Sequence, residues 1–569
     1  MVNVVFLESY SNLEAYNKVK EAKVPLESLI TYCIYKYCSP EVVNLKLVSL
    51  NGNIDKETAV VNLSDNNLEF LKAEEVPWQV ASCVYPVVMY EDTIITGLCA
   101  VARHICKYKV SAPSIYEHEE GLLGFRKSCL QAPNEVSIWT KFCEVDIIKT
   151  VKQILQITVL KEVPKNLVRF ENHLQKPVRV HNVYKVAREL KKNSSKDTEI
   201  DCSIKIEDLD INHQFAESPF LTLADLVLLP SYQIAAQLFG ESMFEALLPF
   251  TYKWYKNITS ITEIQTLLEF FKKLNVKLLS MNQVVIPTTE DVSLYKCDPK
   301  RHNPKKRLFT KEDDIEKALS SVTGGMELNI CSNVFESAFN WNEIPDGANP
   351  TAGHLPDERV MRKSQQLENL ALAVLEIAKE GNLIVDFCSG SGHLGILLAH
   401  LLPKCTIILL ENKEQSLLRA RLRVHEMRLK NVFFFQCNLD FFIGKFDIGI
   451  ALHACGIASD LVLDKCLKAN AKFVICPCCY GSLHATDRLV YPRSNKFNDV
   501  PIDQYLCIGH AADQTHEEHP LAVRGARCMA VIDSDRARLA EEFGYKVTLS
   551  RLKPLSCTPK NNLLIGVPS

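Results

Sequence analysis

The sequence predicts an α/β protein in which a mixed region and a mainly helical region precede a doubly wound parallel sheet. Strand-like and helix-like segments alternate from about residue 325 onward, which is typical of a parallel sheet with helices on both faces. Before residue 290, a region of strands and a hairpin is followed by a long stretch with helical spacing. The 569 residues exceed what one hydrophobic core normally serves, so we expect several domains.

The composition is that of a soluble globular protein, with 47% hydrophobic residues, 23% charged residues and a formal net charge of -3. The chain has no overall excess of basic residues, so its net charge does not favour nucleic acid as a partner. The start, MVNVVFLESY, lacks the basic region of a signal peptide, and no segment has the 18 or so apolar residues of a membrane span. We expect a cytoplasmic protein without membrane contact. Its 21 cysteines should be reduced thiols.

Residues 1–112 are predicted to form a domain of strands and helices that ends in a hairpin and a helix. NVVFLES and EVVNLKLVSL have strand patterns, and SLITYCIYKYC between them has helical spacing. Pro86 opens a β run, and Glu91 and Asp92 supply the turn to the next one. A proline in this position is where thioredoxin-like folds keep a cis peptide bond, so we expect one before Pro86.

Residues 113–290 are predicted to be a helical domain with a polar insertion near 190–215. The segment FLTLADLVLLP contains Thr222-x-x-Asp225, a capping-box variant at the start of an apolar helix. With the preceding hairpin, this box resembles the glutathione transferases, whose thioredoxin-like domain is followed by a helical domain. Residues 291–324 follow as a basic linker, which is either a solvated tether or a segment for RNA contact or nuclear import.

The first domain departs from working glutathione transferases where their chemistry lies. In those enzymes the helix after the hairpin begins with an acidic or amide residue and then Ser or Thr, which bind the γ-glutamyl group of glutathione. Gly97 and Leu98 take these places here, with Thr96 one residue earlier. Ser9, Tyr10 and Ser11 offer hydroxyls near the N-terminus, where we expect an ordinary loop. These departures therefore favour a binding or docking module over an active transferase.

The stretch IVDFCSGSGHLG, residues 384–395, predicts a nucleotide-binding loop after the first strand of residues 325–569. Asp386 ends the strand, Cys388 enters the loop, and Gly390 and Gly392 complete the pattern D-x-x-x-G-x-G of class I methyltransferases. An acid would repel the pyrophosphate of NAD. It favours the ammonium and sulfonium of S-adenosylmethionine, which is the cofactor that we predict; NAD binding and a degenerate empty site are the alternatives.

Two further segments complete the predicted cofactor site. Glu411 ends the second strand, where a carboxylate can accept both ribose hydroxyls, and Asn412 follows it. Asn438 follows the third strand, where the adenine amine is usually recognised. After this strand, the pattern continues to KFVICPC, then to a late apolar run CMAVID, a helix containing RARLAEEFGY and a final strand pair around NNLLIGVP.

Several phrases along the chain resemble one family closely. DFCSGSGHLG, LENKEQSLLRA, ALHACGIASD, CPCCYG and SCTPKNNLLIGVP, with the transferase-like front half, are similar to the glutathione S-transferase C-terminal domain-containing protein family. The back half is also similar to a group that includes a tRNA ribose methyltransferase. The resemblance implies a cytoplasmic protein with a methyltransferase domain, and it favours RNA, particularly tRNA, over protein or a small molecule as the methyl acceptor. A non-catalytic scaffold with a vestigial site, or a glutathione-binding protein with weak transferase activity, are the alternatives.

Two motifs at the ends of the fourth and fifth strands predict the place of the methyl acceptor. LHACG contributes His453 and Cys455, and CPCCYG contributes Cys478 among three cysteines. In the first interpretation these residues line the site, and His453 positions or deprotonates the acceptor. In the second, Cys476, Cys478 and Cys479 bind zinc with Cys455, or with His453 and His484. In the third, Cys478 attacks a pyrimidine ring as a nucleophile.

A basic helix after the second strand indicates where RNA would bind. RARLRVHEMRLK carries Arg419, Arg421, Arg423, Arg428 and Lys430, which form either an RNA track together with the cluster at 300–307 or a solvated helix face.

Overall fold

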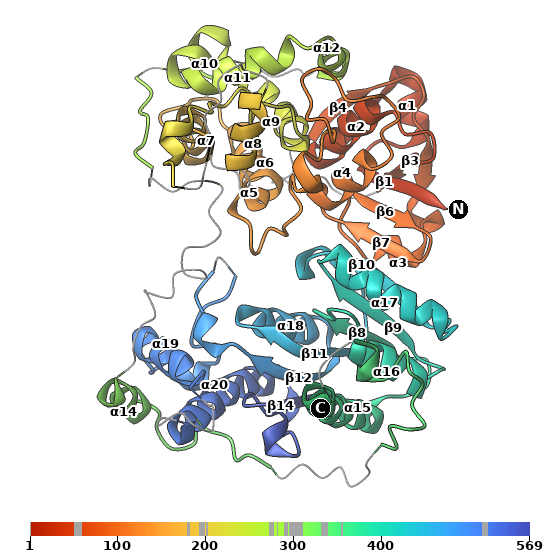
Figure 1. Ribbon diagram of the computed structural model, residues 1–569, viewed down its shortest axis with the longest axis vertical. Helices are drawn as coiled ribbons and strands as arrows, with labels where there is room; N and C mark the ends of the chain where they lie inside the picture. The colour runs from red at the N-terminus through yellow and green to blue at the C-terminus, as the bar shows by residue number, and fades with distance from the viewer. Residues whose placement is uncertain are drawn as a thin grey trace. The chain divides into compact units, whose positions relative to one another are not determined.

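The computed structural model describes residues 2–50, 60–178, 183–192, 200, 203–271, 278–281, 283–289, 294, 311–331, 339–353, 357–486, 488–514 and 522–569. The chain divides into two compact units, Met1–Pro304 and Lys305–Ser569 (Figure 1). The division falls inside the segment predicted as a linker. The basic cluster at 300–307 lies outside the described residues. No helix in the described part of the chain combines the length and the apolar character that crossing a membrane requires.

The first unit contains a mixed sheet whose strands follow the order β7-β6-β1-β3-β5. Parallel pairing joins β1 to β3 and β3 to β5, whereas β1 with β6 and β6 with β7 are antiparallel. The bounds are β1 Asn3–Ser9, β3 Asn44–Ser49, β5 Phe70–Lys72, β6 Val87–Tyr90 and β7 Thr93–Thr96, with a separate pair of β2 Glu21–Pro25 and β4 Val60–Ser64. The peptide bond between Tyr85 and Pro86 is cis, so this prediction is confirmed.

Helices α2 and α4 pack on each other in this unit, and one hydrophobic cluster joins them to the sheet and to the helical segment that follows. The predicted capping box is confirmed at the start of α9, where the Asp225 carboxylate accepts hydrogen bonds from the backbone and hydroxyl of Thr222. The helices are α1 Leu13–Val19, α2 Leu26–Cys38, α3 Trp78–Ala81, α4 Leu98–Cys106, α5 Ile138–Lys141, α6 Ile147–Ile154, α7 Lys165–Gln175, α8 Val183–Lys192, α9 Leu223–Phe239, α10 Glu241–Leu247, α11 Pro249–Thr259 and α12 Thr262–Leu268.

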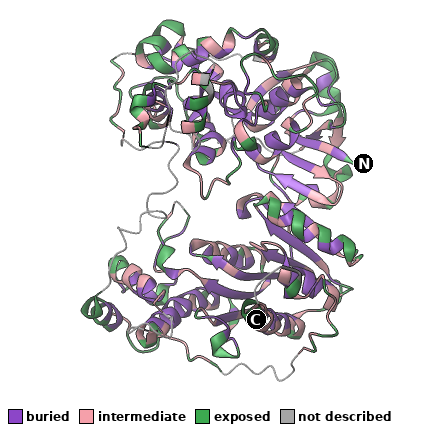
Figure 2. Ribbon diagram, viewed as in Figure 1, coloured by how far each residue is buried: buried purple, intermediate pink, exposed green. Residues whose placement is uncertain are grey.

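The second unit has the doubly wound sheet that the alternating pattern predicts, with the order β13-β14-β12-β11-β8-β9-β10. The strands β12, β11, β8, β9 and β10 are parallel, and β14 runs antiparallel between β12 and β13. The bounds are β8 Leu383–Phe387, β9 Thr406–Glu411, β10 Val432–Gln436, β11 Ile448–Cys455, β12 Lys472–Cys478, β13 Tyr545–Arg551 and β14 Asn562–Pro568. The central strands are buried along most of their length (Figure 2).

Two predictions need correction in this unit. CMAVID belongs to helix α20 rather than standing apart from the following helix, because its side chains continue one buried helical face. The segment 291–324 is not linker throughout, since Ile315, Ala318 and Leu319 bury one face of α14 in the core. The helices are α14 Glu312–Ser320, α15 Asp357–Ile377, α16 His393–Leu401, α17 Glu414–Glu426, α18 Ile457–Ala469, α19 Ile502–Ala511 and α20 Ala522–Glu542.

Candidate functional site

The parallel strands of the second unit end at one edge of the sheet, and this edge is where such folds bind ligands. Asp386 lies near the end of β8, Glu411 ends β9, Cys455 ends β11 and Cys478 ends β12. Of the other predicted residues, His453 lies in β11, Asn438 follows β10, and the rest lie in the segments after β8 and β9: Cys388, Gly390, Gly392 and Asn412. The fold therefore brings the whole predicted site to a single edge.

Asp386 is buried, with its side chain directed at the start of helix α16. Its Oδ2 atom accepts a hydrogen bond of 3.0 Å from the backbone N–H of Gly395. Burial raises the pKa of this carboxyl to about 7, against the opposing effects of that hydrogen bond and of the Lys363 ammonium. A buried carboxyl with a raised pKa is stabilised in its charged form by a cationic ligand.

The Glu411 carboxylate holds the glycine loop in place. Its Oε2 accepts from the backbone N–H of Gly390 over 2.9 Å, and its Oε1 accepts from that of Lys413 over 3.0 Å. Each carboxylate oxygen has a second lone-pair direction, so both can still accept a ribose hydroxyl. Among the described residues, the buried Oγ of Ser389 in this loop has no hydrogen-bond partner, and a Cβ at Gly390 would meet no atom within 4 Å. An unpartnered hydroxyl beside open space fits a polar ligand at this loop.

The next two glycines allow helix α16 to lie close to the sheet. Gly392 has a φ of 75°, and an added Cβ would lie 2.7 Å from Leu409 in β9. A Cβ at Gly395 would overlap Leu409 and would lie 3.1 Å from the Asp386 carboxylate. Any larger residue at Gly395 would therefore push the helix away from the acid that its N-terminus contacts.

Asn412 and Asn438 are brought together although 26 positions separate them in the chain. The Nδ2 group of Asn412 lies 3.5 Å from the Oδ1 atom of Asn438. Asn438 is buried, whereas Cys388 is half-buried in the glycine loop with a left-handed φ of 55°. Both asparagines thus lie beside Glu411, where the sequence predicts ribose and adenine recognition.

Helix α15 supplies two residues that the sequence motifs did not indicate. Burial lowers the pKa of Lys363, and the nearby Asp386 carboxylate opposes this shift. Gln366 donates through Nε2 to the Cys557 carbonyl over 2.8 Å, so its Oε1 faces Nε2 of His453, also over 2.8 Å. This order of bonds makes Nε2 of His453 the donor and leaves Nδ1 as an acceptor. Lys363 and Gln366 belong to none of the predicted motifs, because those motifs lie in and after β8 whereas α15 comes before it.

His453 is held in a special backbone conformation on β11. Its φ is 67°, and the parallel register of β11 with β12 shifts between Leu452 and Cys455. Burial, followed by the positive charge of Lys363, lowers the pKa of His453 to about 4. The imidazole is therefore neutral near pH 7.

Arg423 does not belong to the predicted RNA track, because it is buried. Its guanidinium donates to the carbonyls of Ser391 and Gly347 and lies 3.1 Å from Nδ1 of His393. Burial lowers the pKa of this guanidinium to about 10. It therefore ties the glycine loop to the chain before α15. Of the other predicted cations, Arg419, Arg428 and Lys430 are exposed, and Arg421 is half-buried.

Three cysteine thiols meet at the ends of β11 and β12. The sulfur atoms of Cys455 and Cys478 are 3.3 Å apart, those of Cys478 and Cys479 are 3.2 Å apart, and those of Cys479 and Cys455 are 3.3 Å apart. Cys476, which the zinc interpretation included, is buried elsewhere with its sulfur 3.5 Å from the Lys560 carbonyl. His453 and His484 are also outside the group of ligand atoms that lie within 4.8 Å of one another in the described residues.

The pKa of the Cys478 thiol is raised, first by hydrogen bonding with Cys455, then by hydrogen bonding with Cys479 and by burial. A raised pKa keeps the thiol protonated, and a protonated thiol is a poor nucleophile. This electrostatic setting disfavours the interpretation in which Cys478 attacks a pyrimidine.

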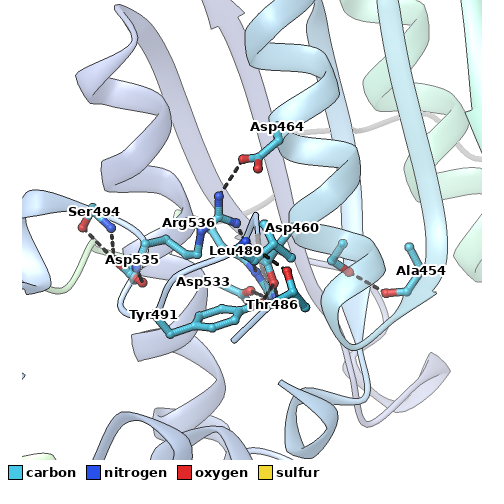
Figure 3. Close-up of polar contacts among 12 residues, drawn as sticks. Ala454, Asp460, Asp464, Thr486, Leu489, Tyr491, Ser494, Asp533, Asp535 and Arg536 are labelled. Atoms are coloured by element: carbon cyan, nitrogen blue, oxygen red, sulfur yellow. Dashed lines mark hydrogen bonds and ion pairs between the residues drawn. The ribbon is translucent and has the colours of Figure 1, made fainter. Parts of the chain in front are cut away.

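The loop after β12 is fixed by a buried ionic network (Figure 3). Arg536 in α20 pairs with both oxygens of Asp460 at 2.9 and 2.8 Å and with Asp533 at 2.9 Å. Tyr480 donates to Asp533 over 2.7 Å, and Tyr491 donates to Asp460 over 2.8 Å. Because every oxygen of Asp460 has a charged partner, the network holds both ends of the loop in one conformation.

The first unit has a second candidate site at the start of α4. The Oε1 atom of Glu144 accepts a hydrogen bond of 3.1 Å from the backbone N–H of Cys99, and Asn134 donates to Oε2 over 3.2 Å. Burial raises the pKa of Glu144 to about 7. Near the N-terminus, the Ser9 and Ser11 hydroxyls are buried in loop hydrogen bonds. Glu144 lies far from Gly97 in the sequence, and no motif indicates it.

A family model for a known domain matches within the second unit. Residues 362–486 match a family model described as "Methyltransferase domain". Among solved structures, magnesium protoporphyrin IX methyltransferase from Synechocystis PCC 6803 aligns at 14% identity over 42% of this chain and 100% of that chain, with a TM-score of 0.24.

Two curated relatives match nearly the full length. The Drosophila melanogaster "Glutathione S-transferase C-terminal domain-containing protein homolog" is 41% identical over 93% of this chain and 92% of its own length. The Homo sapiens "Glutathione S-transferase C-terminal domain-containing protein" is 32% identical over 99% of this chain and 98% of its own length. The chain therefore belongs to the glutathione S-transferase C-terminal domain-containing protein family, with a methyltransferase domain in its second unit.

Proposed function

We propose that this protein is an S-adenosylmethionine-dependent methyltransferase that acts on RNA of the tRNA type. The observation that carries the proposal is the buried Asp386 carboxylate, which stands beside a glycine loop and one strand away from Glu411. An anion followed by a ribose-binding acid suits a cationic nucleoside cofactor and opposes a pyrophosphate.

The cofactor brings a methyl group on a sulfonium, and the residues of the chain bind and orient it. In the proposal, Asp386 faces its positive charge, Glu411 accepts the ribose hydroxyls, and Asn412 and Asn438 contact the adenine end. The Ser389 hydroxyl supplies a further donor. Since methyl transfer needs an in-line nucleophile, correct placement of the acceptor supplies much of the rate increase.

His453 is the residue proposed to place the acceptor. Nδ1 of its neutral ring can accept a hydrogen bond, because Nε2 carries the proton and donates it to Oε1 of Gln366. An acceptor hydroxyl or amine can donate to Nδ1 and be turned toward the methyl group. Cys455 and Cys478 line the same end of the sheet. RNA is favoured as the acceptor class by the exposed cations Arg419, Arg428 and Lys430 on and after α17.

The proposed role of the first unit is to dock partners through a glutathione transferase-like scaffold. The strand order β3-β1-β6-β7 and the cis Pro86 support a thioredoxin-like fold. The Glu144 carboxylate opposes glutathione binding, because it takes the N–H groups at the start of α4 that a γ-glutamyl carboxylate would need.

Calorimetry with S-adenosylmethionine tests the cofactor. We expect micromolar binding, about -8 kcal/mol, by the full chain and its loss in Asp386→Ala. The control is Glu380→Gln, because Glu380 forms an exposed ion pair with Lys404 before the same strand begins. Absence of binding by the folded wild-type protein would contradict the proposal.

Incubation of cellular RNA with the protein and labelled donor tests the acceptor. Specific incorporation into tRNA that is lost in Asp386→Ala supports the proposal. Cofactor binding without incorporation into any RNA would instead favour another acceptor or a scaffold with a vestigial site.

A further inference from the structure

The three thiols of Cys455, Cys478 and Cys479 are closer than ordinary packing places sulfur atoms. Their separations are 3.2 to 3.3 Å, whereas even the smaller carbon atoms make optimal non-bonded contact at about 3.5–4.0 Å. A thiol is a weak donor and its sulfur is a weak acceptor, so these contacts contribute little by themselves. A cation between the sulfurs would exchange three weak S–H contacts for three strong bonds.

The backbone is shaped to form this triangle. Successive strand residues point to opposite faces, so Cys478 and Cys479 would normally diverge. They converge because Cys479 leaves β12 in the left-handed conformation, with φ 57° and ψ 52°. Across the register shift in β11, Cys455 comes opposite Cys478, and Gly456 N–H donates to the Cys478 carbonyl over 2.9 Å. Such shifts redirect side chains beside functional sites.

Gly456 makes the close approach of the two loops feasible. It has a φ of 58°, and an added Cβ would lie 2.8 Å from the Ser482 side chain. On the other side, the backbone N–H groups of Tyr480 and Gly481 donate to Asp513. The three sulfurs are thus held by rigid elements, which is what a preorganised metal site needs.

We propose that Cys455, Cys478 and Cys479 bind one Zn²⁺ ion with a fourth, open coordination position. Sulfur ligands select soft or borderline cations such as zinc, and Zn–S bonds of about 2.3 Å in a tetrahedron place the sulfurs about 3.8 Å apart. Small side-chain rotations from the present 3.2–3.3 Å reach that spacing. A [4Fe–4S] cluster fits less well, because each thiolate would bind a different iron atom and the sulfurs would stand further apart.

Charge balance supports a divalent ion. Binding releases three protons from three thiols to solvent, so the thiolates and Zn²⁺ carry a net charge of -1. The Lys560 ammonium stands near Cys478 and Cys479 and offsets this charge in part, since it also pairs with Asp513 at 3.2 Å and donates to the Ala512 carbonyl over 2.7 Å.

Among the described residues, only these three side chains place ligand atoms at the site, so in the proposal water or another exogenous ligand occupies the fourth position. Cys455 is exposed, so water or another ligand can reach the ion. Zinc sites with three protein ligands and one exchangeable position are the kind that activate a bound group, whereas structural sites are closed by a fourth residue. The inference does not depend on methyl transfer.

Metal analysis of the full chain, purified with a phosphine reductant, tests the site. We expect about one zinc per chain, and its loss in Cys455→Ser, Cys478→Ser and Cys479→Ser. The matched control is Cys331→Ser, because Cys331 is another exposed cysteine of the second unit. A metal-free wild-type protein, equal zinc loss in the control, or a disulfide joining two of the three cysteines would each overturn the proposal.

Cobalt substitution needs no variant and so remains decisive if the serine variants misfold. We expect thiolate-to-cobalt charge-transfer absorption, intense tetrahedral bands and a spectral change when 2-mercaptoethanol is added. Absence of the charge-transfer absorption would overturn the proposed metal site, and a spectrum unchanged by the added thiol would overturn the open coordination position.

Alkylation followed by peptide mass spectrometry tests the same three cysteines. It should find Cys455, Cys478 and Cys479 protected by zinc and Cys331 unprotected; equal labelling with and without zinc would contradict the proposal.

Discussion

The carboxylate of Glu144 accepts a hydrogen bond of 3.1 Å from the backbone of Cys99, so helix α4 is capped by a side chain from the helical segment. The chain therefore satisfies internally the group that would otherwise bind an anion, because free N–H groups and the helix dipole at an N-terminus attract negative charge.

We expect the wild-type protein not to be retained on glutathione resin. Glu144→Ala should lower the free energy of unfolding by about 1–2 kcal/mol through loss of the cap. Glu144→Gln should lose less, since its amide oxygen can accept the same bond. Denaturant unfolding of the three proteins measures the effect. Retention of the wild type on the resin would contradict the assignment of Glu144 as the occupant.

Asp386 should make cofactor binding depend on pH. Its folded pKa of about 7 lies above the ordinary value of 3.8, so its contribution to stability is present below pH 4 and is lost as the pH rises through about 7. Binding of a cation has the opposite dependence and weakens below pH 7 as Asp386 takes up a proton.

We therefore expect Asp386→Asn to bind S-adenosylmethionine at least about 10–100-fold more weakly at pH 8, while the ligand-free variant unfolds at higher denaturant than the wild type. Calorimetry and urea titration at pH 5 and pH 8 measure both effects. Unchanged affinity in the variant would show that Asp386 does not face the cofactor.

His453 should affect methyl transfer more than cofactor binding. We expect His453→Ala to lower turnover by about 100-fold with little change in cofactor affinity. Gln366→Leu should cause a smaller loss by freeing the ring to rotate. Because the pKa of His453 is about 4, turnover should show no titration of this residue between pH 5.5 and 8. A pH dependence near 6.5 that disappears in His453→Asn would be incompatible with this environment.

The Arg536 network should dominate the stability of the second unit. Arg536→Leu leaves the buried Asp533 carboxylate without its cation and leaves Asp460 with Arg493 alone, at 3.3 Å, which should cost about 3–5 kcal/mol of unfolding free energy. Lys404→Ala, which breaks the exposed pair with Glu380, should cost less than about 1 kcal/mol. Urea unfolding compares the two; similar small losses would show that the carboxylates find other partners.

The exposed cations on and after α17 should govern RNA affinity. Replacement of Arg419, Arg428 and Lys430 by glutamate should weaken tRNA binding and reduce the slope of log affinity against log salt by about 1 for each cation that neutralises a phosphate in the complex. Lys468→Glu, on the exposed face of α18, is the control. Filter binding across a salt series measures the slope. An effect of equal size in the control would indicate non-specific attraction.

The order of strands and helices in the second unit could be predicted from the sequence because its signals are local. Asp386 and Glu411 mark strand ends, Gly390 marks the loop after the first of them, and parallel strands must bring those ends to one edge. Thr222 and Asp225 likewise identify a helix start through a spacing of three residues. CMAVID is ambiguous, because a short apolar run suits a strand as well as a buried helix.

The glycine loop, its two acids and the Thr222–Asp225 capping box follow from the sequence alone, since each depends on neighbours along the chain. Tertiary packing is what selects the distant groups that share a site: Lys363 opposite Asp386, Gln366 on His453, and Glu144 over α4. Tertiary packing also groups Cys455 with Cys478 and Cys479 and leaves Cys476 outside this group. The physical reason is that the left-handed backbone of Cys479 and the register shift in β11 redirect side chains, and the spacing of cysteines in the sequence does not encode either feature.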